Sequence, residues 1–220
     1  VTGEVTEPRF GLSESEYERL ASQVDIIVNA AASVNFREEL DQALSINALS
    51  LLNLTDLANR AGRIPLIQVS TCYVNGFNSG DIFEQMVSPA KGGIRRNAGG
   101  YFEVDGLIAS LQEKIRKVRQ ANRDPQTLGA ELTELGIREA HRYGWNDTYT
   151  FTKWIGEQIA ARELLDGTLT IFRPSVIEST LREPAPGWIE GVKVGDAVVL
   201  AYARGKTRFF PARPDEIIDI

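Results

Sequence analysis

The stretch "DIIVNA", residues 25 to 30, is the first indication of the fold class of this sequence. It is a short apolar run without alternation, which is typical of a strand covered on both faces in a parallel sheet. A second run of the same kind, "IPLIQVST", follows at residues 64 to 71. Between the two, residues 41 to 62 carry leucines near helical spacing and end at Gly62, a frequent helix stop. The order strand, helix, strand predicts parallel strands joined by a helical crossover.

The same alternation extends in both directions along the chain. Further elements are expected as helices at residues 12–23, 149–165 and 192–206, and as a strand at residues 169–177. Ser13 stands three residues before Glu16, the spacing at which each side chain bonds a free backbone amide at a helix start. Pro174 interrupts the last strand, because proline has no amide hydrogen to donate to a sheet. These elements predict an α/β fold, a Rossmann-like doubly wound parallel sheet, as a single domain over residues 1–220.

Residues 77–147 interrupt the alternation. They hold the charged stretch "LQEKIRKVRQANR" (111–123) and a second helical pattern around "AELTELGIREAHR" (130–142). A structureless loop of this length is uncommon inside a compact domain. We therefore expect a helical insertion that lies over one end of the sheet.

Both ends of the sequence read as interrupted. "VTGEVTEP" (1–8) resembles the end of a strand already in progress, and "RFFPARPDEIIDI" (208–220) stops inside an apolar pattern. We expect an internal piece of a longer polypeptide.

Composition limits the classes of function. The 220 residues carry a net charge of -6, which argues against nucleic acid as the main partner. No apolar run approaches the roughly 18 residues of a membrane span, and no signal peptide is visible. We therefore expect a soluble, cytoplasmic protein. A single cysteine, Cys72, and a single histidine, His141, exclude an internal disulfide and leave no usual set of zinc ligands, so no metal is expected.

Polar candidates gather where the strands end. Ligands of parallel sheets bind at the carboxyl ends of the strands. Those ends are "NAAAS" (29–33), "STCYVNG" (70–76) and "RPSVI" (173–177). Tyr149 and Lys153, on the helix between the second and third strands, are four residues apart and so share one helix face.

This pair suggests proton-transfer chemistry. The Lys153 ammonium is expected to favour the ionised form of Tyr149 and so lower a pKa that is about 10 in the free phenol. Such a phenol donates a proton to a carbonyl oxygen as hydride arrives, or removes one in the reverse direction. A hydroxyl from Thr71 would hold the same oxygen, with Ser70 as the alternative. The Tyr/Lys spacing alone is also common on exposed helices and becomes informative only in context.

That context comes from an ordered set of motifs. They are "VDIIVNAAASVNF" (24–36), Asn47, "LIQVSTCYVNG" (66–76), "YTFTKWIGE" (149–157), "IFRPSVIEST" (171–180) and "EPAPGWIEG" (183–191). Together they resemble the fatty acyl-CoA reductases, members of the extended short-chain dehydrogenase/reductase superfamily whose reductase portion is called the male-sterility domain. The resemblance covers nearly the whole chain.

The resemblance implies roles for individual residues. Tyr149 matches the proton donor, Lys153 the lysine that binds the nicotinamide ribose and lowers the tyrosine pKa, and Thr71 the residue that bonds the substrate carbonyl. The cofactor-binding positions it implies are Ala30, Ala31, Ala32, Asn47, Lys153, Pro174, Ser175, Val176 and Ile177. The superfamily's glycine-rich turn would lie before Val1. The family usually uses NADPH, which we expect by resemblance, with NADH left open.

The implied reaction is reduction of a long-chain acyl thioester, carried on coenzyme A or on an acyl carrier protein, to an aldehyde and, with a second hydride, to a primary alcohol. Two alternatives remain open. One is another extended short-chain enzyme, such as a sugar-nucleotide epimerase or dehydratase, and the other is a non-catalytic interaction domain.

Four smaller predictions concern charged and nucleophilic residues. Cys72 is expected to be a packing residue, because no lysine or histidine is near it in sequence to make an acyl-accepting thiolate. His141 is expected to be exposed. "EKIRKVRQANR" (113–123) is expected to be a solvated face, with coenzyme A phosphates, an acidic carrier protein or peripheral contact with a membrane surface as alternatives. Arg95 and Arg96, flanked by glycines, are better phosphate candidates.

Overall fold

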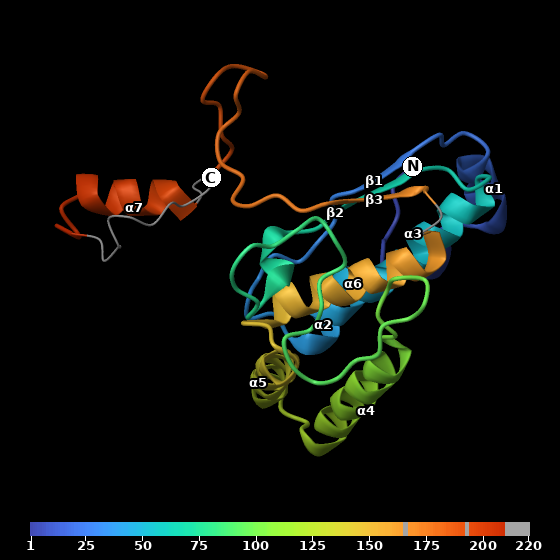
Figure 1. Cartoon of the computed structure of the whole chain (residues 1–220), viewed down its shortest axis with the longest axis horizontal. Coiled ribbons are helices and arrows are strands. Elements are labelled where there is room, and N and C mark those ends of the chain that lie inside the picture. Colours follow the sequence, from blue (N-terminus) through green and yellow to red (C-terminus); the bar gives the residue numbers. More distant parts are fainter. Residues whose placement is uncertain (165–166, 192–193, 210–220) are drawn as a thin grey trace. The chain divides into compact units, whose positions relative to one another are not determined.

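The computed structural model describes residues 1–164, 167–191 and 194–209 (Figure 1). The chain divides into two compact units, Val1–Arg173 and Pro174–Ile220. The first unit holds the sheet and the helices α1 to α6, and the second holds α7 (Val194–Ala203). The single domain expected over the whole length stays a prediction, because each unit is described by itself.

A parallel sheet forms the upper layer of the first unit (Figure 1). It consists of β1 (Ile27–Asn29), β2 (Leu66–Val69) and β3 (Leu169–Phe172), paired in the order β1-β2-β3. Asn29 lies opposite Gln68, so the carboxyl ends of β1 and β2 are level. Because the strands are parallel and consecutive, the connecting helices return on the same side of the sheet. The predicted alternation of strands and helices is confirmed.

Helices form the rest of this unit. They are α1 (Glu14–Ala21), α2 (Leu40–Leu44), α3 (Ser50–Arg60), α4 (Asp105–Ala121), α5 (Pro125–Tyr143) and α6 (Thr148–Leu164), with short turns η1 (Pro8–Gly11), η2 (Ser45–Leu49) and η3 (Cys72–Asn75). The capping box at α1 is present as predicted. Glu16 N donates to Ser13 Oγ at 3.4 Å, and Ser13 N donates to a Glu16 carboxylate oxygen at 3.0 Å.

The helix expected at residues 41–62 is interrupted by a π-helical turn, η2. This turn lies against α6 at Gly156, where an added Cβ would come within 2.3 Å of the Asn47 carbonyl oxygen. The glycine therefore permits a backbone contact that no larger residue allows. Extra-residue turns of this kind often occur at functional sites, and this one contains Asn47.

α6 is buried on all sides. α2, η2, α3 and α5 pack against it, and β3 contacts its sheet side. Trp154, Phe151 and Ile155 are fully buried, and the Trp145 and Trp154 ring centroids are 4.5 Å apart. Dense packing around a helix opposes its local opening. The packing therefore fixes where the first turns of α6 lie, with the Tyr149 side chain half-buried.

The insertion contains the two helices that the sequence predicts, α4 and α5. It does not lie over an end of the sheet, however, because α5 packs against α6 and α2, and α4 packs against α5 and α2. In Figure 1 both lie on the side of α6 away from the strands. Their apolar stripes, with Leu111 and Leu132 fully buried, find apolar partners on this helical layer.

Two further expectations differ from the structure. Residues 1–8 do not form a strand end, because Glu4 N donates to Phe10 O and Val5 O accepts from Asn53 Nδ2, so their backbone bonds are made in a turn and to α3. β1 is covered on one face only within the described residues. Its outer face leaves Ile26 and Val28 51% and 59% exposed.

Candidate active site

The candidate residues lie where β1 and β2 end and α6 begins. Thr71 follows β2 and caps η3, because its Oγ1 accepts a hydrogen bond from Tyr73 N at 3.2 Å. Tyr149 and Lys153 occupy the first turns of α6, as predicted. Asp147 caps that helix by accepting from Thr150 N at 2.8 Å.

Thr71 and Tyr149 meet at this edge. Burial raises the pKa of the half-buried Tyr149 phenol, and a hydrogen bond from the Thr71 side chain lowers it in part. Since Thr71 Oγ1 accepts its own bond from the backbone of Tyr73, its hydroxyl proton is left for the phenol. The nearby Cys72 thiol acts in the opposite sense and raises the Tyr149 pKa.

Lys153 is only 2% exposed, and its Nζ donates to Val69 O at 2.6 Å. Burial lowers the pKa of this ammonium to about 8, and Glu157 raises it in part. The expectation that Lys153 lowers the Tyr149 pKa is wrong for this structure, because burial of the phenol dominates and the ammonium bonds a strand carbonyl. At neutral pH both groups therefore carry their protons, a neutral acid beside a cation.

Asn47 joins the loop after β1 to α6. Its Oδ1 accepts from Ser33 N at 2.9 Å, and its Nδ2 donates to Ser33 O at 3.1 Å and to Thr152 Oγ1 at 3.2 Å. Ser33 directly follows Ala32, and Thr152 precedes Lys153. The amide therefore fixes the predicted cofactor loop relative to the helix that carries the lysine.

The end of β1 offers an open surface made of small side chains. Ala30 and Ala31 are exposed, and Ala32 is half-buried. Below them, Asn29 accepts from Ala31 N at 3.2 Å and donates to Gln68 at 2.7 Å, so the strand ends are locked together. A flat ring can approach such a backbone closely.

These residues fit a nicotinamide nucleotide on three structural grounds. The alanines leave the strand end open, and the Lys153 ammonium has donors to spare beyond the Val69 carbonyl. The third is the hydroxyl of Ser70, which is buried and has no hydrogen-bond partner among the described residues. A buried hydroxyl without a partner is costly unless a ligand satisfies it.

A buried ion pair stands behind Lys153 and was not predicted from the sequence. Glu157, one turn further along α6, binds Arg173 at the end of β3 through two hydrogen bonds of 2.8 and 2.7 Å. The i, i+4 spacing of Lys153 and Glu157 was the visible signal. The partner Arg173 was not foreseeable, because it lies across a strand.

Other predicted residues lie elsewhere. Pro174 to Ile177 belong to the second unit, and their role beside the cofactor stays a prediction. Arg95 forms a two-pronged pair with Glu103 at 2.7 and 2.9 Å, and Arg96 donates to Gly100 O at 3.2 Å. Both arginines are therefore engaged in a local turn, which weakens their case as phosphate ligands.

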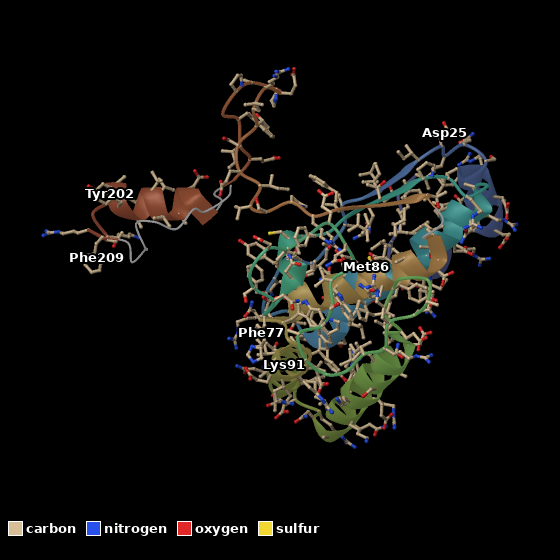
Figure 2. All side chains as sticks on the ribbon, in the orientation of Figure 1. Asp25, Phe77, Met86, Lys91, Tyr202 and Phe209 are labelled. Carbon is tan, nitrogen blue, oxygen red and sulfur yellow. The ribbon has the colours of Figure 1, made fainter. Side chains whose placement is uncertain are left out.

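The remaining charged residues of the insertion are engaged in local contacts. His141 is exposed, as predicted, and pairs with Asn146 O at 3.0 Å. Lys91 lies over the Phe77 ring, 4.9 Å from its centroid (Figure 2). Cations of the stretch 113–123 pair with acids, as in Lys114 with Glu139 at 2.7 Å.

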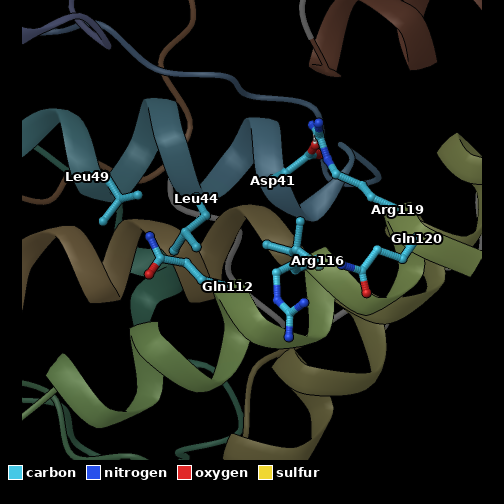
Figure 3. Close-up of a pocket in the computed structure, with 8 residues that line it drawn as sticks. Asp41, Leu44, Leu49, Gln112, Arg116, Arg119 and Gln120 are labelled. Carbon is cyan, nitrogen blue, oxygen red and sulfur yellow. Dashed lines mark hydrogen bonds and ion pairs between the residues drawn. The ribbon is translucent and has the colours of Figure 1, made fainter.

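A separate pocket of about 380 Å³ lies between the α2–η2 segment and α4 (Figure 3). Leu44, Leu49 and Ile115 are among its apolar lining residues, and Arg116 and Arg119 of α4 also line it. Arg119 is already paired with Asp41. None of the predicted catalytic or cofactor residues lines this pocket.

The fold places this chain in a class. A parallel sheet with helical crossovers, whose polar candidates lie at the carboxyl ends of the strands, is the arrangement of a Rossmann-like nucleotide-binding domain. The chain belongs to the male sterility protein family, whose model, that of an NAD-binding domain, matches residues 1–220.

Curated relatives point the same way. The chain is 36% identical over 225 residues to fatty acyl-CoA reductase 2, chloroplastic, of Arabidopsis thaliana, covering 100% of this chain and 36% of that protein. It is 32% identical over 222 residues to the alcohol-forming fatty acyl-CoA reductase of Simmondsia chinensis, covering 100% of this chain and 44% of that protein. The chain thus spans less than half the length of these relatives.

A solved structure supports the fold. The terminal R domain from the myxalamid biosynthetic pathway aligns with a TM-score of 0.53 and 22% identity, over 86% of this chain and 35% of that one. None of the helices in the described part of the chain is long and apolar enough to cross a membrane.

Proposed function

We propose that this chain belongs to an enzyme that reduces a fatty acyl thioester with a nicotinamide cofactor, giving an aldehyde and, after a second reduction, a primary alcohol. One observation carries the proposal. Thr71, Tyr149 and Lys153 stand together at the carboxyl end of a parallel sheet, in a chain similar along its full length to fatty acyl-CoA reductases.

The residues of this chain act on the carbonyl oxygen of the substrate. When bound, the cofactor supplies a hydride to the acyl carbon. Thr71 and Tyr149 donate hydrogen bonds to the oxygen on which negative charge develops. The Tyr149 phenol is protonated at neutral pH and burial raises its pKa further, so it can give its proton to that oxygen. It takes the proton back as the carbonyl re-forms and the carbon–sulfur bond breaks, and the departing thiolate is protonated from solvent. In the second reduction the proton stays on the alcohol, and the phenolate is reprotonated from solvent.

Lys153 supplies positive charge without giving up its own proton. Lys153 is not among the groups that shift the Tyr149 pKa in this structure, so we assign its charge to the bound cofactor and not to the phenolate. Its spare donors would bind the ribose hydroxyls of the cofactor, and Asn47 would hold the loop that faces the ring. Thr71 is the preferred hydroxyl, with the partnerless Ser70 as its competitor for the substrate oxygen.

The finer assignments extend the proposal. NADPH is the expected cofactor, a long-chain acyl group on coenzyme A or an acyl carrier protein is the expected substrate, and the cytoplasm is the expected compartment. The name of one relative places that relative in the chloroplast.

The first test is NADPH oxidation by the complete polypeptide at saturating long-chain acyl-CoA, with Tyr149→Phe beside it. We expect acyl-CoA-dependent oxidation that falls by about 10² to 10⁴ in the variant, the usual contribution of a positioned acid. Tyr101→Phe, the same chemical change in the insertion, should keep wild-type activity. Binding of NADPH without oxidation would move the epimerase or dehydratase alternative ahead, and absence of cofactor binding would favour the interaction domain.

A further inference from the structure

We propose that Glu157 and Arg173 form a positioning pair for the active site, in which the Glu157 carboxylate holds Lys153 as a cation and Arg173 holds the carboxylate. The inference rests on the proposed function, because it gives a purpose to the charge on Lys153. Neither residue is expected to touch the substrate.

Glu157 and Arg173 form a buried ion pair with two parallel hydrogen bonds. The Glu157 side chain is 0% exposed and that of Arg173 is 18% exposed. Arg173 Nε and Nη2 donate to the two carboxylate oxygens at 2.8 and 2.7 Å, and Nη1 donates to Gln85 O at 2.9 Å. Two parallel hydrogen bonds orient a carboxylate as well as neutralise it. The pair thereby ties β3 and the insertion to α6.

Glu157 links this ion pair to the candidate site because it acts on the charge of Lys153. Glu157 lies four residues after Lys153 and shares its helix face, and its negative charge favours the protonated lysine. Burial acts in the opposite sense. Without the carboxylate, the ammonium would lose its charged stabiliser and keep the cost of burial.

Other groups around the site leave this role to Glu157. From β2, Lys153 meets the neutral Val69 carbonyl, and from η2 the neutral Asn47 amide bonds Thr152, the residue before Lys153. Cys72 of η3 and Asp147, which precedes α6, act on Tyr149, and His141 of α5 acts on Asp147. Glu157 is the charged group that acts on Lys153.

Arg173 gives Glu157 a permanently charged partner. Arginine keeps its charge at any pH relevant to proteins, and its two hydrogen bonds hold the Glu157 carboxylate in place. A buried pair that served stability alone could be replaced by neutral groups of similar size at little cost. This pair should not be replaceable without moving the titration of Lys153.

The test uses the double variant Glu157→Gln with Arg173→Met in the complete polypeptide, because it removes both charges and leaves none unpaired. Titration of Lys153 is followed by NMR of carbon-13 at lysine Cε, and its signal is assigned by its absence in Lys153→Arg. We expect the midpoint to fall from about 8 by about one pH unit. The loss of reductase activity at high pH should move downward by the same amount.

A matched control removes a partly buried pair outside the site. Lys114→Met with Glu139→Gln deletes the bridge between α4 and α5 and should leave the Lys153 titration where it was. Should the double variant fail to fold, Glu157→Asp retains both charges with a shorter reach, and the midpoint should fall by a smaller amount.

A folded double variant, or a folded Glu157→Asp, with an unchanged Lys153 midpoint overturns the proposal. The NMR readout needs no turnover, so it separates two failures. If the midpoint shifts but no thioester is reduced by the wild type, the pairing stands and the proposed reaction falls.

Discussion

At the scale of single residues, burial of the Lys153 ammonium lowers the free energy of unfolding of the protein. Its pKa falls from 10.5 to about 8 on burial, so the folded protein binds its proton less tightly than the unfolded chain does. Below about pH 8 both states are protonated and the full cost applies. As pH rises from about 8 to 10.5 the unfolded chain binds more protons, so the stability of the fold rises through that window.

Lys153→Met should therefore stabilise the protein at pH 7. The drop from 10.5 to about 8 corresponds to at most about 3 kcal/mol in the free energy of unfolding. Val69 O would still accept from Gln68 Nε2 at 3.1 Å. Denaturant unfolding of both proteins between pH 7 and 10.5 measures the gain, which should shrink as pH rises. Lys117→Met, at an exposed site on α4, should leave the stability unchanged, and equal behaviour of the two variants would contradict this account.

Sequence reasoning at this scale succeeded where partners are set by local spacing. Tyr149 and Lys153 follow from one helix turn, and Thr71 follows from the rule that strands of a parallel sheet end at one edge. It failed for the sign of the Tyr149 pKa shift, because burial depends on what packs around the phenol. It also missed Arg173, whose partner on α6 becomes adjacent only when β3 pairs with β2.

At the scale of elements, the close contact of η2 with α6 positions Asn47. Gly156 makes this contact possible, because an added Cβ would lie 2.3 Å from Asn47 O. The spacing of apolar residues predicts one helix at residues 41–62. It cannot predict the π turn, because the spacing contains no information about the close approach of the α6 backbone. The capping box of α1 was predictable, because both of its residues lie within one turn.

Gly156→Ala should destabilise the protein and loosen cofactor binding together. The methyl group must displace the η2 backbone, a kind of overpacking that costs about 1 to 3 kcal/mol. Asn47 would then lose its hold on Ser33, so the NADPH dissociation constant should rise. Gly106→Ala on α4 has open space around its added Cβ and should be neutral or stabilising by up to about 1 kcal/mol. Thermal unfolding and cofactor titration of both variants check this, and a Gly156→Ala protein as stable as the wild type would contradict it.

At the scale of the whole molecule, charge would influence how the proposed anionic substrate approaches. The chain carries a net charge of -6, and cations of α4 are paired with acids, Arg116 with Glu113 and Arg119 with Asp41. The described surface thus provides no cluster of unpaired cations on this helix to attract the phosphates of coenzyme A. The sequence predicts that the stretch 113–123 is a solvated face, and these ion pairs are consistent with that prediction.

The salt dependence of the proposed reaction should reflect this balance. Salt screens the repulsion between this net negative chain and the proposed anionic thioester, so kcat/KM for acyl-CoA should stay level or rise as ionic strength increases from about 0.02 to 0.2 M. Neutralising the basic side of α4, with Arg116→Gln and Lys117→Gln, should change kcat/KM by less than about twofold, because both cations already face Glu113. Steady-state rates at several salt concentrations measure both effects. A steep decline with salt that these two substitutions remove would instead make α4 the docking site for the coenzyme A phosphates, and the surface of the molecule would then steer its substrate toward the site at Tyr149.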